Sequence, residues 1–338
     1  MKTYAGIDLH SSNSFIGVIN HKNERLHSRR YDNNLKTVLK VLLKYKRSLQ
    51  GVVIESTYNW YWLVDGLMEN GYKVHLANPA AIQQYKGLKH RDDKKDAFWL
   101  AHLLQLGILA QGYIYPKKLR SVRDMFRRRM MFVKQRTTQT LSLQSMIARN
   151  RGVEQSASAI VRFRDDFIKQ MFDCPHLVST ALHQMETIRF LGKHIEAIES
   201  EVETMVELDS AYRGLLTIPG IGRILAMTIM LEVGDIRRFE KVGHYSSYCR
   251  CVKAQSLSNG KKKGNNNRKN GNRYLAWAYV EAANHNKRSC SQARKFVERK
   301  IAEKNYTVAI KALANKLSKA SYFIMRDQTT YDPALLFR

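Results

Sequence analysis

The chain has 338 residues, and its 57 Lys and Arg residues against 29 Asp and Glu residues give a formal net charge of +28. This length and a hydrophobic content of 44% are enough for two or three domains with cores of their own, so folding needs no disulfide framework. The charge makes a polyanion the expected partner, and no apolar run reaches the roughly 20 residues of a membrane-spanning helix.

The first third of the chain predicts a β-meander followed by alternating helices and strands. Two short apolar, β-branched runs are separated by a polar turn, and a third strand follows them. Strands first and then alternation with helices is the element order of an RNase H-like fold. The expected strands are residues 4–9, 14–19, 25–31, 51–55 and 73–77, and the expected helices are residues 35–42, 60–70 and 93–106.

Four carboxylates lie on these elements. Asp8 lies within the first strand and Glu55 at the end of a central one, both apolar settings in which an unpaired carboxylate would be costly. Asp93 and Asp96 are three residues apart and share one helix face, while Asp92 would face away, toward solvent or as an outer group. Hard cations prefer oxygen ligands, so the four predict a Mg²⁺ site, with Mn²⁺ as a substitute. Solvated surface pairing is the alternative for each carboxylate alone.

The middle of the chain carries two long helical patterns. Residues 117–151 hold eleven Lys or Arg residues against the single acid Asp124, which predicts a strongly basic helix. Residues 181–208 predict a heptad-like seam. We expect either an antiparallel pair packed within one subunit or a protruding coiled coil that brings subunits together on a polyanion. The seam residues are Met185, Ile188, Leu191, Ile195, Ile198, Val202 and Met205.

A glycine-rich turn follows between two apolar helical segments. Its sequence, Ile218-Pro219-Gly220-Ile221-Gly222, resembles a helix-hairpin-helix turn, in which glycines let the backbone approach a DNA phosphate. Arg223 directly after the turn favours a phosphate partner. The alternative is a helix-helix turn whose glycines act only as caps.

A basic segment at residues 250–273 contains eight Lys or Arg residues and no acid, and its Gly/Asn-rich tract from Asn259 to Asn272 predicts a mobile loop. Ser256 and Ser258 lie there beside a lysine cluster. A serine nucleophile needs positive charge around the phosphate that it attacks, and the cluster would supply it. The alternative is an ordinary basic loop that binds nucleic acid.

The four cysteines are few and irregularly spaced, which indicates a reducing compartment. Cys249 and Cys251 with His244 nearby raise the alternative of a zinc site, but no second ligand pair has the spacing that structural zinc sites use. The N-terminus lacks the basic-then-apolar pattern of a signal peptide. We expect the protein to stay in the compartment where it is made.

From residue 4 to about residue 325 the chain resembles the DEDD transposases of bacterial insertion sequence family 110, which are RNA-guided serine recombinases. The order and spacing of several motifs carry this resemblance. They are Gly6-Ile7-Asp8, Val53-Ile54-Glu55, Asn78-Pro79, Asp93-Lys94-Lys95-Asp96-Ala97, Ile218-Pro219-Gly220-Ile221-Gly222, Ser258-Asn259-Gly260-Lys261 and Lys269-Asn270-Gly271-Asn272-Arg273-Tyr274-Leu275.

The resemblance implies a metal site and a serine nucleophile. The metal ligands would be Asp8, Glu55, Asp93 and Asp96, and Ser258, favoured over Ser256 by its spacing to the Gly271-Asn272 motif, would attack a DNA phosphate to form a phosphoserine link. The expected fold class is α/β plus α. Its parts would be an RNase H-like (RuvC-like) metal domain at 1–115, a basic helix and coiled-coil region at 116–210, and a mainly helical transposase domain at 211–338.

The resemblance also implies the partners. These would be DNA, a noncoding bridge RNA that pairs with target and donor DNA, and further copies of the chain, as dimers that assemble into a tetramer in the bacterial cytoplasm at the nucleoid. The residues expected to bind nucleic acid are Gly220, Gly222, Arg223, Arg127, Arg128, Arg129, Lys134, Arg136, Lys261, Lys262, Lys263, Arg268, Lys269 and Arg273.

Two other functions remain open from the sequence. One is a metal-dependent nuclease for four-way junctions or RNA-DNA hybrids, which would use water as the nucleophile while the serine loop only binds. The other is an architectural nucleic-acid-binding protein with vestigial carboxylates.

Overall fold

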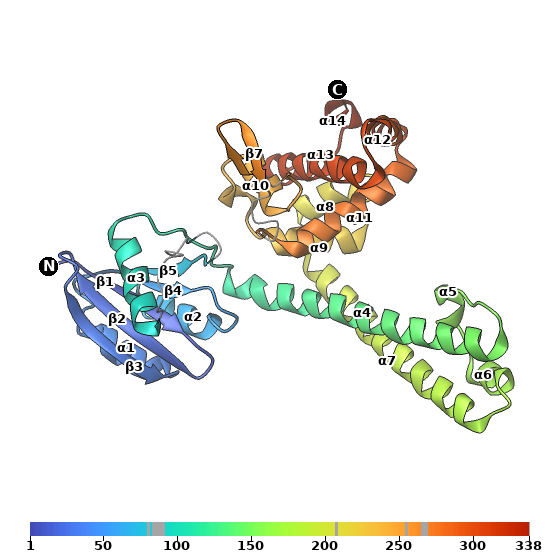
Figure 1. The fold of residues 1–338 in the computed structure, drawn as a ribbon, viewed down its shortest axis with the longest axis horizontal. Helices are drawn as coiled ribbons and strands as arrows, with labels where there is room; N and C mark the ends of the chain where they lie inside the picture. The colour runs from blue at the N-terminus through green and yellow to red at the C-terminus, as the bar shows by residue number, and fades with distance from the viewer. Residues whose placement is uncertain (80–81, 83–91, 207–208, 254–255, 265–269, 338) are drawn as a thin grey trace. The chain divides into compact units, whose positions relative to one another are not determined.

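A computed structural model describes residues 1–79, 82, 92–206, 209–253, 256–264 and 270–337 (Figure 1). The chain divides into two compact units, Met1–Lys117 and Lys118–Arg338, each with a hydrophobic core of its own. The first unit ends near the expected boundary at residue 115, and the division of the remainder into two further domains stays a prediction.

The first unit is built on a five-stranded mixed sheet with the strand order β3-β2-β1-β4-β5. β1, β2 and β3 form the expected antiparallel meander, whereas β1, β4 and β5 run parallel. Each predicted strand is present, with ends that differ by no more than two residues. The strands are β1 (Thr3–Leu9), β2 (Asn13–Asn20), β3 (Arg25–Asp32), β4 (Leu49–Glu55) and β5 (Val74–Ala77).

Helices cover both faces of this sheet because alternate residues of each strand point to opposite sides. Ile7, Ile16 and Ile54 form one core with α1 (Leu35–Leu43) and α2 (Tyr61–Glu69). On the other face, smaller clusters around Phe15 and Val53 pack against α3 (Asp93–Gln105). The sheet is therefore the middle layer of an α/β unit.

Glycine permits α3 to approach β1 closely. A Cβ atom built on Gly6 would lie 1.9 Å from the carbonyl oxygen of Ala97 and 2.9 Å from the nitrogen of Ala101. Both of these are backbone atoms, which cannot move aside as a flexible side chain can. Only glycine at position 6 allows α3 to lie at this distance from the strand that carries Asp8.

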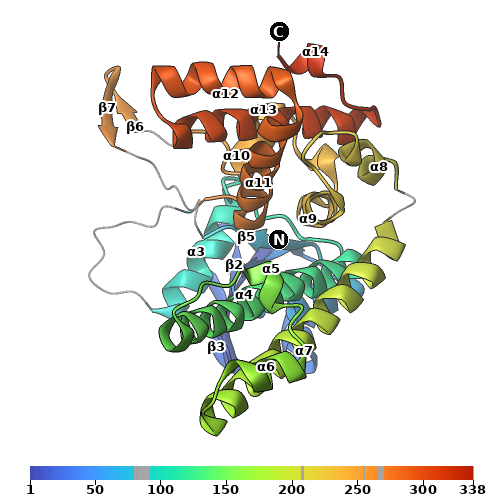
Figure 2. The same ribbon diagram turned by 90° about the vertical axis from the view of Figure 1, so that its right-hand side faces the viewer.

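The second unit contains the two long helices, α4 (Lys117–Arg151) and α7 (Pro175–Val206), which run antiparallel (Figures 1 and 2). The Gln184 amide donates to the Ser142 hydroxyl at 2.8 Å, and the Arg129 guanidinium donates to the Glu199 carboxylate at 2.7 Å. Residue numbers therefore rise along α4 as they fall along α7. The antiparallel pair within one subunit is confirmed, and a role of this pair in bringing subunits together stays a prediction.

The seam of α7 follows the predicted heptads except at its end. Met185, Ile188 and Val202 are buried as expected, but Met205 is 56% exposed and Val206 is buried in its place. The prediction for Met205 was wrong because an α-helix drifts relative to a strict heptad, and because α7 packs at this end against α9 (Arg223–Val233) as well as against Phe126 of α4.

The remainder of the second unit is mainly helical: α5 (Ala157–Ile160) and α6 (Asp165–Met171) pack with the far ends of α4 and α7, and the elements from α8 (Ser210–Leu216) onward surround a second core. No helix among the described residues is long and apolar enough to cross a membrane. The other elements of the second unit are η1 (Ile236–Arg238), α10 (Val242–Tyr248), β6 (Ser256–Ser258), β7 (Lys261–Gly264), α11 (Arg273–Ser289), α12 (Ser291–Glu303), α13 (Tyr306–Asp327) and α14 (Pro333–Leu336).

Substitution of Gly6 tests the close approach of α3 to β1. We expect Gly6→Ala to lower the free energy of unfolding of the full chain by about 1–3 kcal/mol, because the added methyl group must push α3 away from the sheet. Gly112→Ala is the matched control, since the nearest atom to its added Cβ would lie 3.5 Å away. Urea denaturation followed by circular dichroism measures both, and equal stability of the two variants would contradict the proposed constraint.

Candidate metal centre and serine hairpin

The sheet and α3 bring the predicted carboxylates toward one place. Ile7 of β1 pairs with Ile54 of β4 in parallel, so Asp8 and Glu55 occupy the next row on neighbouring strands. Asp93 and Asp96 lie in the first turn of α3, which packs on the same face. Asp8 is only 5% exposed, so its carboxylate is withdrawn from bulk water.

His10, which the sequence interpretation missed as a site residue, lies beside these carboxylates. The Nε2 atom of His10 lies 3.2 Å from Asp8 Oδ2 and 3.2 Å from Asp93 Oδ2. Potential ligand atoms of these three residues all lie within 4.8 Å of one another. Glu55 and Asp96 fall outside that tight trio. The only signal in the sequence was the position of His10, two residues after Asp8 at the end of a strand.

Arg30 is a second residue that the sequence interpretation missed. Asp8 pairs with Phe15 across β1 and β2, and Phe15 pairs with Arg30 across β2 and β3, so Asp8 and Arg30 lie in one row on the same face. The Arg30 guanidinium forms an ion pair with the Asp93 carboxylate. Arg30 therefore brings positive charge to the edge of the carboxylate cluster.

The surroundings of Asp8 raise the pKa of its carboxyl group to about 6. Burial is the largest cause, and the negative charges of Asp93, Glu55 and Asp96 raise the pKa further, whereas His10 lowers it. The other three predicted carboxylates therefore all act on Asp8, although only Asp93 belongs to the tight trio with it. A divalent cation would relieve this repulsion, which is the usual reason for gathering carboxylates.

Asp92 has a structural role next to this site. Its side-chain Oδ1 accepts a hydrogen bond from the Lys95 backbone N–H at 2.6 Å, so it is the N-cap of α3. This cap fixes the start of the helix at Asp93, and with it the place where the two helical carboxylates begin.

Strands β6 and β7 form a hairpin at residues 256–264, which we call the serine hairpin. Ser258 lies at the end of β6 and is exposed. It pairs with Lys261 of β7, and the two residues between them, Asn259 and Gly260, have φ values of 49° and 70°. These positive φ values are those of a tight two-residue hairpin turn, for which Asn-Gly is a favoured sequence. Within the tract predicted to be a mobile loop, residues 261–264 therefore form a strand.

The predicted nucleic-acid contacts of the hairpin lie partly outside the described residues. Lys261 and Lys263 are exposed on β7, and Lys262 lies between them. Arg268 and Lys269 lie outside the described residues. Arg273 begins α11 and is also exposed.

Several of the other predicted contacts form ion pairs within the chain. Arg127 pairs with Glu232 at 2.6 Å, and Arg223 pairs with Glu203 at 2.8 Å. Arg129 pairs with Glu199, as the α4 and α7 contact shows. Along α4, Arg128 and Lys134 are exposed and Arg136 is half-buried. The role of all these cations in nucleic-acid binding stays a prediction.

The glycine-rich turn packs against a neighbouring helix. Gly220 has a φ of +90°, and a Cβ atom there would lie 2.5 Å from the nitrogen of Asn286 on α11. The Asn286 amide also donates to the Pro219 carbonyl at 2.6 Å. Gly222, by contrast, is exposed at the N-terminus of α9 with no atom within 4 Å of a built Cβ. Packing alone therefore accounts for glycine at position 220, and only Gly222 faces open space.

Zinc ligands do not assemble near the cysteines in the described part of the chain. Cys249 is buried and Cys251 is half-buried, and burial raises the pKa of the Cys251 thiol to about 12. Among the described residues, the trio of Asp8, His10 and Asp93 is the group of potential ligands that lies within reach of one ion. The zinc alternative finds no support there.

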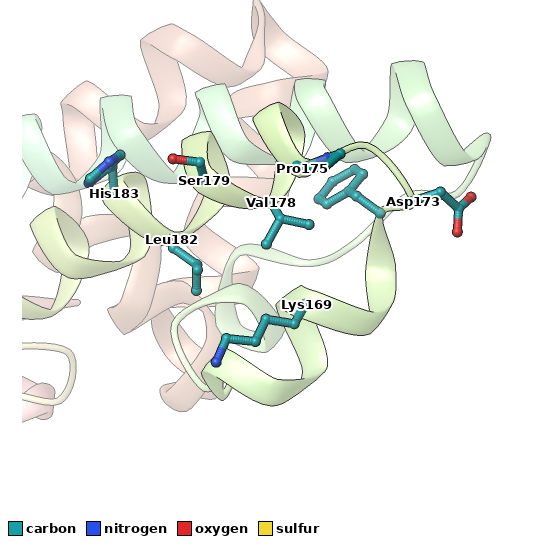
Figure 3. Close-up of a pocket in the computed structure, with 8 residues that line it drawn as sticks. Lys169, Asp173, Pro175, Val178, Ser179, Leu182 and His183 are labelled. Atoms are coloured by element: carbon teal, nitrogen blue, oxygen red, sulfur yellow. The ribbon is translucent and has the colours of Figure 1, made fainter.

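A pocket of about 450 Å³ lies elsewhere, between α6 and the start of α7 (Figure 3). Lys169 and Asp173 border it together with apolar side chains such as Val178 and Leu182. It contains none of the predicted site residues.

Two family models match different parts of the chain. Residues 5–149 match the model of a DEDD transposase family of the IS110 type, and residues 212–298 match a model described as the transposase IS116/IS110/IS902 family. The chain is 25% identical over 227 residues to the putative transposase y4qE of Sinorhizobium fredii, a match that covers 67% of this chain and 55% of that protein.

Two further curated relatives are similar. The transposase for insertion sequence element IS1328 of Yersinia enterocolitica is 26% identical over 166 residues, which are 46% of this chain and 48% of that protein. An uncharacterized 43.6 kDa protein of insertion element IS110 of Streptomyces coelicolor is 26% identical over 161 residues, which are 47% of this chain and 38% of that protein. The matches thus span about half the length of these relatives. The chain belongs to the IS110 family of transposases.

Proposed function

We propose that the protein is the DNA transposase of an insertion sequence, and that it cleaves and rejoins DNA strands with the help of a divalent metal. The observation that carries this proposal is the buried Asp8 carboxylate, with His10 and Asp93 within ligand distance of one ion and two further carboxylates acting on it. A phosphodiester substrate also suits the net charge of +28.

The first unit would be an RNase H-like domain. The support for this is its strand order, with three antiparallel strands followed by two parallel ones, and the position of Asp8 on the central strand. The matching family model covers residues 5–149, which include nearly the whole sheet.

The donor atoms of the cluster fit a divalent cation. Carboxylate oxygens suit Mg²⁺, and Mn²⁺ accepts the same oxygens and an imidazole nitrogen. Asp8, Glu55, Asp93 and Asp96 would hold the cation, with His10 as a further donor. When bound, the cation would supply Lewis-acid stabilisation of the charge on phosphate oxygens. Arg30 would orient the Asp93 carboxylate through the ion pair.

The nucleophile would be Ser258. Its Oγ would attack a DNA phosphorus, forming a new phosphorus–oxygen bond while the bond to one DNA oxygen breaks. The serine proton would pass to solvent, and the departing DNA oxygen would leave as a hydroxyl group. A hydroxyl of the other strand would then attack the phosphoserine and release Ser258. Each step exchanges one phosphoester for another, so no external energy source is needed.

The partners follow from the same proposal. We propose that DNA and a bridge RNA bind the basic surfaces of the second unit and that the chain acts as a dimer or tetramer. Exposed Arg128 and Lys134 on α4, together with Lys261 and Lys263 of the hairpin, support a nucleic-acid surface.

A nuclease that uses water is the second candidate. The carboxylate cluster lies wholly within Met1–Lys117, whereas Ser258 lies in the other unit, so the cluster itself does not require the serine. Such an enzyme would cut DNA without becoming attached to it.

Removal of one carboxylate tests the metal site. We expect Asp8→Asn to weaken Mn²⁺ binding by about tenfold or more, because a charged ligand becomes neutral at the buried centre of the cluster. Isothermal titration of the full chain with Mn²⁺ measures the affinity. Asp92→Asn is the matched control: it removes the same charge one residue from Asp93, and asparagine retains the helix cap. Equal affinity of the two variants would contradict the assignment.

Removal of the hydroxyl tests the nucleophile. We expect Ser258→Ala to abolish covalent attachment of DNA to the protein while DNA binding is retained, because no oxygen remains to form the phosphoester. The gene is expressed with its native flanking DNA, cells are denatured, and protein-linked DNA is quantified. Ser256→Ala is the matched control and should form the adduct.

Other outcomes have distinct meanings. An adduct that survives in Ser258→Ala and disappears in Ser256→Ala would assign the nucleophile to the other serine. Breaks that are never attached to protein in the wild type, but are lost in Asp8→Asn, would favour the water-using nuclease.

A further inference from the structure

The segment that carries the serine hairpin begins after α10 and ends at α11, and the structure ties its two ends together. The Asn272 backbone N–H donates to the Tyr248 carbonyl at 2.6 Å. The Arg250 guanidinium donates to the Gly271 carbonyl at 2.8 Å. Gly271 has a φ of +90°, and a Cβ atom there would lie 2.4 Å from the Tyr248 carbonyl oxygen, so glycine is required for this contact.

Both the oxygen and the nitrogen of the Asn272 side-chain amide form hydrogen bonds. Its Oδ1 accepts hydrogen bonds from the Tyr274 and Leu275 backbone N–H groups at 2.8 and 3.1 Å and so caps α11. Its Nδ2 donates to Glu232 Oε2 at 2.6 Å. Because the residue is only 8% exposed, water cannot easily replace either interaction.

Glu232 lies on α9 and is 3% exposed. Besides Asn272, its carboxylate accepts two hydrogen bonds from Arg127 of α4, from Nε and Nη2, each at 2.6 Å. The same guanidinium lies 4.7 Å from the centre of the Tyr274 ring, just after the cap of α11. A buried carboxylate held in this way has a single orientation, because any rotation would leave a buried charge without a partner.

We infer that Glu232 and Asn272 are positioning residues for the serine hairpin. The inference rests on the proposed role of Ser258 as nucleophile. Glu232 joins α4, α9 and the base of the hairpin segment, and it selects asparagine at position 272, since an amide can cap α11 with its oxygen while donating to a carboxylate. Because the base contacts hold Tyr248 and Asn272 together, they limit how far Ser258, which lies between them in the chain, can move from that base.

The test exchanges the carboxylate and the amide between positions 232 and 272. In Asn272→Asp, two carboxylates face each other, and in Glu232→Gln the new amide faces the donor group of either Arg127 or Asn272. The double variant, Glu232→Gln with Asn272→Asp, restores the donor and acceptor pair between positions 232 and 272, but its new amide nitrogen also faces Arg127 Nη2, which donates to the same carboxylate oxygen in the wild type. The amide at position 232 would donate to the carboxylate at position 272, that carboxylate would still cap α11, and the summed charge of the two positions is unchanged. Glu199→Gln is the matched control, because it breaks the other Arg–Glu pair of α4 away from the hairpin.

Two measurements on the full chain are made for each variant. The first is the yield of protein-linked DNA, which we expect to fall about 100-fold in each single variant, since a small displacement of a nucleophile is costly, and to rise again in part in the double variant. The second is hydrogen exchange of residues 248–276 in the free protein. We expect faster exchange there in each single variant, a smaller increase in the double variant, no change in α13, and wild-type exchange in Glu199→Gln.

The results separate the two proposals. Wild-type adduct yield in both single variants would overturn the positioning role, and so would equally faster exchange throughout the second unit, which indicates only a stability defect. Loss of the adduct in these variants while Ser258→Ala still forms it would overturn the proposed nucleophile, and the positioning of Ser258 with it.

Discussion

The contact between α3 and β1 at Gly6 is the constraint on which the candidate metal centre depends. A side chain at position 6 would meet the backbone of Ala97, so glycine sets how near the helix lies to the strand. That distance brings Asp93, at the first turn of α3, within reach of His10, which also contacts Asp8 on β1. The raised pKa of Asp8 is the electrostatic consequence, since burial and neighbouring carboxylates both disfavour its charge.

In the second unit, hydrogen bonds join the two ends of the segment that carries the serine hairpin, at Tyr248 and Asn272. Gly271 and Asn272 form backbone contacts with the end of α10, and Glu232 connects them to Arg127 on α4. This arrangement explains why an arginine of the basic helix has a carboxylate partner inside the protein. The charge of a helix therefore overstates the number of cations that it offers to nucleic acid, because Arg127 and Arg129 are both engaged in ion pairs.

Much of the fold could be predicted because its signals are local. Strand and helix periodicity indicated the elements of the first unit, and the buried setting of Asp8 followed from its apolar strand. His10 and Arg30 were missed because they reach the cluster through a turn and a row of paired strands, which depend on register. The Asn259-Gly260 turn was a local signal that composition obscured. Glu232 could not be found from sequence, because its partners lie on α4 and at the start of α11, far from it along the chain.

The central claim is that a serine of the hairpin becomes joined to DNA. The most direct measurement is mass spectrometry of protein-linked DNA after digestion with nuclease and protease, which identifies the residue that carries a nucleotide. We expect a nucleotide on the peptide that contains Ser258, attached at its hydroxyl oxygen. A nucleotide attached to a residue outside residues 256–258, or attached DNA that is equally abundant without the carboxylate of Asp8, would contradict it.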